Sequence, residues 1–149
     1  MAINGSGLFV ATFVDVFSGG LSIDLTDTNL KAALFTTSLG DPDFTTDVGY
    51  GAAPYNANEA SGTGYTSGGA TLTGTSFSGN AGVATFDAND VTWSSSTLTN
   101  VRGVLIYDDT QEDDNGIILV DLGQGYSTSN GSFVVQWHSN GIFSLNLVP

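Results

Sequence analysis

Two short apolar segments separated by an acidic loop constrain the fold of this 149-residue chain more than any other feature. Residues 101–107 and 117–122 are rich in Val, Ile and Leu, and the loop between them carries five acidic side chains. Polar loops of this kind reverse the chain between antiparallel strands, so the pattern predicts a β-hairpin. Neighbouring side chains such as Val104 and Leu105 point to opposite faces of the first strand. Because both faces are apolar, both must be covered, which places the hairpin inside a sheet.

The composition is typical of β-rich proteins. Hydrophobic residues make up 40% of the chain and charged residues only 11%, and 20 glycines accompany many Ser and Thr. About eight short candidate strands separated by Gly, Asn and Asp turns predict one domain over residues 1–149. We expect an all-β fold, a β-sandwich of the immunoglobulin-like or jelly-roll type. The chain has no Cys, so disulfides cannot stabilise this fold.

The charge balance excludes two classes of partner. Fifteen acidic residues against Lys31 and Arg102 give a formal net charge of -13. This charge repels phosphate backbones and anionic lipid surfaces, so neither nucleic acid nor a membrane is an expected partner. The apolar residues 7–17 carry Asp15, follow no basic segment and are too short to span a bilayer, so we expect no signal peptide and synthesis in a cytoplasm.

Residues 8–17 fit two kinds of local structure. Their β-branched content favours a strand, whereas a short N-terminal helix would gather apolar side chains on one face. The side chains that would share this face are Phe9, Phe13, Val16 and Phe17. Gly19 and Gly20 end the segment in either case.

A long loop is expected at about residues 41–69, which are rich in Gly, Asn, Asp, Ser and Thr and show no sustained period. Loops of this length inside compact domains are usually functional or ordered by a partner. Tyr50, Tyr55 and Tyr65 are spaced through it, and aromatic residues are rare in disordered linkers. We therefore expect an ordered loop that packs on its own domain or on a neighbour.

Asn140-Gly141 predicts a second hairpin near the C-terminus, because this dipeptide lies between two alternating segments, residues 132–138 and 142–147. Alternation predicts that the apolar members of both segments face inward. These are Phe133, Val135, Trp137, Phe143, Leu145 and Leu147.

Residues that could support catalysis are few. His138 is the only histidine and is expected at an exposed strand end, with no activated-nucleophile motif, phosphate-binding loop or dinucleotide fingerprint in the chain. We therefore expect no enzyme activity and no cofactor.

Carboxylates crowd together only in the loop of the first hairpin. The candidate calcium ligands there are Asp108, Asp109, Asp113 and Asp114. The spacing does not match a helix-loop-helix calcium site, and the alternative is a solvated hairpin tip that raises solubility.

Six short motifs occur in a fixed order along most of the chain. They are Lys-Ala-Ala-Leu-Phe-Thr at 31–36, Asn-Glu-Ala-Ser-Gly-Thr-Gly-Tyr at 58–65, Ala-Thr-Phe-Asp at 84–87, Val-Thr-Trp at 91–93, Val-Arg-Gly-Val-Leu-Ile-Tyr-Asp at 101–108 and Ile-Leu-Val-Asp at 118–121. In this order the chain resembles small virion proteins of tailed bacteriophages, described as capsid decoration (cement) proteins, head fibres or tail-fibre-like proteins.

The resemblance implies a non-enzymatic part of the outer capsid surface that is made in the host bacterial cytoplasm. Such proteins commonly form homotrimers that bridge and stabilise neighbouring subunits of the major capsid protein. The expected partners are therefore the major capsid protein and other copies of this chain. Aromatic and apolar side chains enrich interface cores, and the candidates for such contacts are Leu8, Phe9, Phe13, Phe17, Tyr50, Tyr55 and Tyr65.

Two other functions stay open at this stage. A tail or head fibre knob would bind a host surface glycan through exposed aromatic residues such as Trp93 or Tyr126. A small jelly-roll lectin or carbohydrate-active enzyme would need a cleft lined by aromatic and carboxylate side chains.

Overall fold

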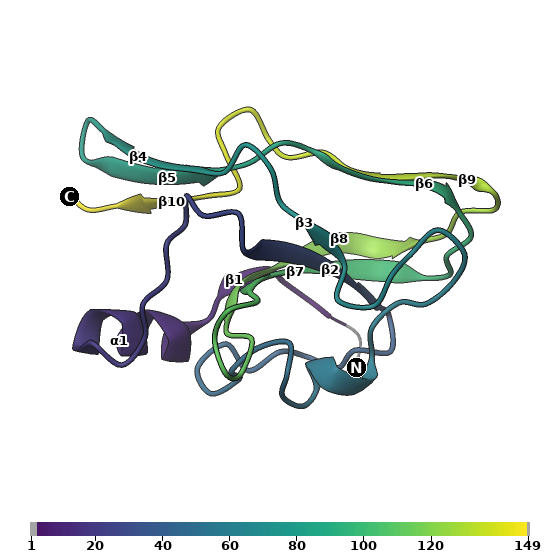
Figure 1. Ribbon diagram of the computed structural model, residues 1–149, viewed down its shortest axis with the longest axis horizontal. Coiled ribbons are helices and arrows are strands. Elements are labelled where there is room, and N and C mark those ends of the chain that lie inside the picture. Colours follow the sequence, from purple (N-terminus) through teal and green to yellow (C-terminus); the bar gives the residue numbers. More distant parts are fainter. Residues whose placement is uncertain (1–2, 149) are drawn as a thin grey trace.

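The predicted central hairpin lies in the interior of a five-stranded sheet. In the computed structural model, which describes residues 3–148, β7 (Val101–Asp108) pairs antiparallel with β8 (Gly116–Tyr126). β2 (Leu30–Thr36) pairs with the other side of β7, and the strand order is β1-β8-β7-β2-β3 (Figure 1). The outer strands β1 (Gly7–Leu8) and β3 (Ala70–Thr71) have two residues each. The prediction of an interior hairpin is confirmed.

Two smaller antiparallel sheets form a second layer along one side of the five-stranded sheet (Figure 1). One has the order β10-β5-β4 and comprises β4 (Ser76–Asn80), β5 (Val83–Asp87) and β10 (Phe143–Asn146). The other pairs β6 (Val91–Ser96) with β9 (Gly131–Val135). The fold is mainly β with two layers, so the prediction of a β-sandwich is confirmed.

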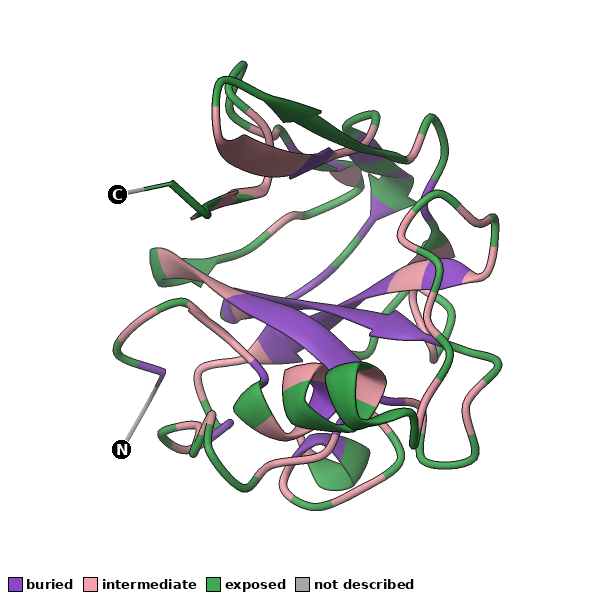
Figure 2. Cartoon of the chain, turned by 90° about the vertical axis from the view of Figure 1, so that its left-hand side faces the viewer, coloured by how far each residue is buried: buried purple, intermediate pink, exposed green. Residues whose placement is uncertain are grey.

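Alternate residues of β2 and β7 serve two separate apolar clusters. Leu34 and Val104 belong to the cluster between the layers, which also contains Phe86, Trp93 and Phe133 from the smaller sheets. The next residues along each strand belong to a second cluster on the opposite face: Ala33, Phe35, Leu105 and Tyr107. Figure 2 shows these central strands as the most continuously buried part of the chain. Both faces of the sheet are therefore covered.

Residues 41–69 cover the second face. Tyr55, in the short 3-10 helix Tyr55–Ala57, is fully buried and packs edge-on against Phe35 with ring centroids 5.6 Å apart. Tyr50 stacks on Tyr107 at 4.6 Å. This loop is therefore packed on its own domain through its tyrosines.

The N-terminal segment contains both of the structures that fit its sequence. Residues 7–8 form β1, and α1 (Val10–Ser18) follows after Phe9. Phe9 is fully buried and packs edge-on against Phe44, which anchors the start of the helix. Gly19 ends the helix in the left-handed conformation, with φ of 82°, where a residue without Cβ avoids strain.

The predicted C-terminal hairpin is wrong. β9 pairs with β6 and β10 pairs with β5, so the two segments belong to different sheets. The Trp137 backbone N–H donates to Asp90 Oδ1 at 2.9 Å and its indole N–H donates to the Asn89 carbonyl at 3.1 Å. These bonds direct the chain away from β9, and Asn140-Gly141 forms only a local turn in which Gly141 N–H donates to His138. Of the residues predicted to face inward, Phe133 and Val135 are buried, but Leu147 is exposed.

An ion pair between neighbouring central strands predicts loss of stability in acid. Arg102 Nε donates to Asp121 Oδ1 at 3.0 Å, and this contact holds the pKa of Asp121 below its ordinary value of 3.8. A lowered folded-state pKa stabilises the fold above about pH 4, and this stabilisation is lost as pH falls through the folded-state value. We expect Asp121→Asn to lower the unfolding free energy by about 1 kcal/mol at pH 7, and the difference from wild type to shrink below about pH 4. Urea unfolding at pH 7, 4 and 3 measures this, and a constant difference would contradict it.

Candidate functional site

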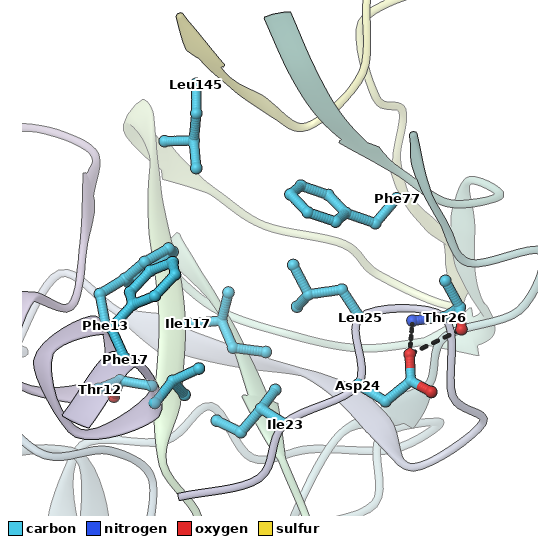
Figure 3. A pocket seen from close by; sticks show the side chains of 11 residues that line it. Thr12, Phe13, Phe17, Ile23, Asp24, Leu25, Thr26, Phe77, Ile117 and Leu145 are labelled. Carbon is cyan, nitrogen blue, oxygen red and sulfur yellow. Dashed lines mark hydrogen bonds between the residues drawn. The ribbon is translucent and has the colours of Figure 1, made fainter. Parts of the chain in front are cut away.

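An apolar cleft lies between α1 and the β10-β5-β4 sheet (Figure 3). Its volume is about 310 Å³, which is within the range of ligand and side-chain pockets. Separate parts of the chain, from α1 to β10, contribute its apolar walls: Phe13, Val16, Phe17, Ile23, Leu25, Phe77, Ile117 and Leu145. We call this feature the helix cleft.

The helix that forms one wall of the cleft is apolar on its exposed side as well. Thr12 is its buried residue, and α1 contacts β8. Val10, Val14 and Phe17 recur at the spacing of one helical face and are exposed, with 58% of Val14 and 84% of Phe17 open to solvent. Within residues 3–148 no helix is long and apolar enough to cross a membrane.

A row of three phenylalanines crosses the sheet opposite the helix, and Phe77 of this row lines the cleft. Phe77, Phe86 and Phe143 are direct partners across β4, β5 and β10. Phe86 is buried, and Phe143 packs edge-on against Phe13 of α1 at 6.4 Å, so it ties the helix to the sheet. Phe77 lies on the outermost strand and is 40% exposed. The row therefore crosses all three strands, and its Phe77 end is open at the cleft.

A shallow hollow on the outer side of α1 continues this apolar area. It is lined by Leu8, Val10, Phe13, Val14 and Phe17, of which Phe13 and Phe17 also line the helix cleft. The two hollows thus form one apolar surface, which we call the helix surface. Exposed apolar surfaces of this kind usually mark interaction sites.

The helix cleft carries one negative charge. Among the described residues that line it, only Asp24 is charged. The Thr26 hydroxyl and backbone N–H donate to Asp24 Oδ1 at 2.7 and 2.8 Å, and these bonds lower the pKa of Asp24, so it is ionised at neutral pH. The two cationic side chains of the protein lie elsewhere, where Lys31 pairs with Asp109 and Arg102 with Asp121.

The structure separates the predicted contact residues into three groups. Leu8, Phe13 and Phe17 come together on the helix surface. Phe9 and Tyr55 are fully buried, so the prediction is corrected for these two because a covered side chain offers no surface to a partner. The remaining two, Tyr50 and Tyr65, have their hydroxyls turned to a carboxylate within the loop.

That carboxylate, Glu59, organises the long loop and was not singled out from the sequence. It accepts four hydrogen bonds, from Tyr50 Oη at 2.8 Å, Tyr65 Oη at 2.7 Å, Ser67 Oγ at 2.6 Å and Gly68 N–H at 2.7 Å. Burial, followed by the bond to Glu59, raises the pKa of Tyr65, so its hydroxyl stays a donor. The signal for this role is a single glutamate between tyrosines in a loop that has no other Glu.

The candidate calcium ligands do not converge. Asp108 is buried and its Oδ1 accepts bonds from the Thr110 N–H and hydroxyl at 2.8 and 2.6 Å, which shapes the turn. Asp109 pairs with Lys31 at 2.7 Å. For Asp114, burial and the nearby Asp109 raise the pKa. Across residues 3–148 no three acidic, His or Cys side chains gather to hold a metal ion, so Asp108, Asp109, Asp113 and Asp114 form no ligand set.

The aromatic residues considered for glycan binding differ in accessibility. Trp93 is 6% exposed and packs among Tyr65 and Phe133, so it cannot stack on a sugar. Tyr126 is 44% exposed and borders a shallow groove that also contains Val134.

No protein-family model matches the chain, and neither a curated protein nor a solved structure matches it.

The Glu59 cluster predicts a specific loss of stability. We expect Glu59→Ala to lower the unfolding free energy by about 2 kcal/mol, because it leaves several donors without their charged acceptor. Glu112, the other glutamate of the chain, is exposed in the acidic loop, and Glu112→Ala is the matched control with a change of under about 0.5 kcal/mol. Urea unfolding measures both. Equal effects of the two substitutions would show that the Glu59 cluster contributes nothing.

Proposed function

We propose that this chain is a non-enzymatic structural protein of a tailed-bacteriophage virion, a decoration (cement) protein that binds and stabilises the assembled major capsid lattice. The observation that carries the proposal is the helix surface, a continuous exposed apolar area on a chain with a net charge of -13. A protein with this charge gains nothing in water from exposing Phe17, whereas a partner that covers it gains apolar burial. The resemblance to virion proteins indicates the major capsid protein as this partner.

Under this proposal the chain lies on the outer capsid surface and binds the major capsid protein and its own copies as a homotrimer. Interfaces of this kind combine an apolar, aromatic core with a polar rim. Phe13, Phe17 and Phe77 would form the core, and the surrounding Ser, Thr and Asp side chains would form the rim. Because one site would span neighbouring capsid subunits, assembled capsids would bind the chain and free subunits would not.

A fibre knob that binds a host glycan is the second candidate. The exposed Tyr126 beside its shallow groove favours it, since sugars stack on exposed aromatic rings. The burial of Trp93 removes the other aromatic residue considered for this role.

The copy number per virion separates these functions. We expect quantitative mass spectrometry of purified particles of the encoding phage to give a ratio to the major capsid protein that matches the capsid lattice, because decoration follows its symmetry. A handful of copies per particle would indicate a fibre. Absence from particles would contradict both virion roles.

A matched pair of double variants locates the contact surface. We expect Val14→Ser/Phe17→Ser to weaken binding to purified capsids at least about tenfold, because it removes apolar area from the helix surface. Val134→Ser/Tyr126→Ser removes side chains that are 53% and 44% exposed on the other groove and should change the affinity by less than about twofold. Cosedimentation of labelled protein with capsids measures both. The reverse pattern would assign binding to the Tyr126 groove.

A further inference from the structure

The open edge of the β10-β5-β4 sheet adjoins the helix cleft and carries no charged side chain. β4 is one of the two outer strands of this sheet, and its five residues, Ser-Phe-Ser-Gly-Asn at 76–80, are all exposed. Proteins normally protect such edges with charged residues, proline or bulges, because unpaired backbone groups can pair with another chain. None of these features protects β4.

The register shows which backbone groups of β4 are unpaired. The Phe86 carbonyl accepts a hydrogen bond from Ile142 N–H at 2.8 Å, on the β10 side of β5. In an antiparallel ladder, Phe86 and its partner Phe77 are then a non-hydrogen-bonded pair, so Phe77 directs its own N–H and C=O to the open edge. Gly79, two residues further along, has the same orientation. The edge therefore offers a regular set of donors and acceptors.

The side chain of Phe77 joins this edge to the cleft. Phe77 lines the helix cleft from β4, opposite Phe13 and Phe17 of α1 (Figure 3). A strand added to β4 would direct every second side chain to the same face of the sheet as Phe77. The edge would thus bind the backbone of an extended segment while the cleft receives its alternate apolar side chains.

The charge distribution determines the kind of segment that fits. Both cationic side chains of this chain are held in ion pairs, and Asp24 is the charged residue of the cleft. A second copy would bring another net charge of -13 and no free Lys or Arg to offset it. A segment with its own Lys or Arg is electrostatically complementary.

We propose that the β4 edge and the helix cleft bind, by strand addition, an extended segment of a partner protein in which apolar residues alternate with polar ones and Lys or Arg residues flank them. The binding mode and the chemistry of the segment follow from this chain alone. The assignment of the segment to the major capsid protein rests on the proposed function.

The test uses two synthetic peptides that differ only in charge. One is fluorescein-labelled Lys-Lys-Val-Thr-Leu-Thr-Phe-Thr-Lys-Lys, and the other has Glu in place of each Lys. Fluorescence anisotropy should give saturable binding of the first peptide to the wild-type protein and binding at least about tenfold weaker for the second. No saturable binding of the Lys peptide up to about 1 mM would overturn the proposal.

Gly79 provides a matched pair of variants for the backbone contact. Gly79→Pro removes the outward N–H and fills the edge, whereas Gly79→Ala keeps the N–H, and an added Cβ meets only the Val83 carbonyl at 3.9 Å. We expect Gly79→Pro to weaken binding of the Lys peptide at least about tenfold and Gly79→Ala to change it by less than about twofold. Equal affinities would overturn strand addition.

Circular dichroism and sedimentation check the folding of the variant and the oligomeric state of the protein. If circular dichroism shows that Gly79→Pro unfolds, Phe77→Ser replaces it, with Val134→Ser as the control, and equal peptide binding by these two would overturn the proposal. Sedimentation of the protein alone should give no dimer that Gly79→Pro abolishes, since such a dimer would make a second copy the occupant. Because the peptide assay contains no capsid, its failure is distinct from failure of the proposed function, which appears as absence from virions.

Discussion

The structure depends on one constraint, that both faces of the strand β7 are apolar. Val104 and Leu105 point to opposite sides, and neither can remain in water without loss of stability. The chain meets this constraint with two different covers. The smaller sheets cover one face with phenylalanine and tryptophan side chains, and the long loop covers the other with tyrosines. The protein is therefore a sandwich on one side of its central sheet and a loop-covered sheet on the other.

The two covers differ in how they are held. The sheet layer is held by strand pairing. The loop is held by isolated backbone bonds, such as Ala60 N–H to the Leu34 carbonyl at 2.7 Å, and by the Glu59 carboxylate, which accepts four hydrogen bonds within the loop. The helix α1 belongs to neither cover. It contacts β8 through its buried side and Phe143 through Phe13, and its remaining apolar face stays exposed. This incomplete coverage produces the helix surface and the cleft.

The part of this fold that could be predicted from sequence is the part that local pattern determines. The central hairpin and the long loop follow from periodicity and turn residues. The prediction of a C-terminal hairpin is wrong because Trp137 donates hydrogen bonds to Asp90 and Asn89, which are distant in sequence, and these bonds redirect the chain. β4 shows no strand pattern in the sequence, because Ser and Gly make up most of it. The cleft could not be predicted, because it requires α1, β4 and β10 to meet in space, although two of its lining residues, Phe13 and Phe17, were among the predicted contact residues.

The positions of the only two cationic residues have a consequence for proteolysis. Trypsin cleaves after Lys and Arg. Lys31 lies in β2 with partners on both sides, and Arg102 lies in β7 between Val101 and Gly103, which both pair with β2 and β8. Cleavage at either bond requires these central strands to open, so the rate of tryptic digestion reports opening of the core rather than fraying of loops. Because the chain has only two Lys and Arg residues, trypsin leaves fragments that are too long for convenient peptide quantification. A protease that cuts at acidic residues, which the chain has in abundance, would sample its loops instead.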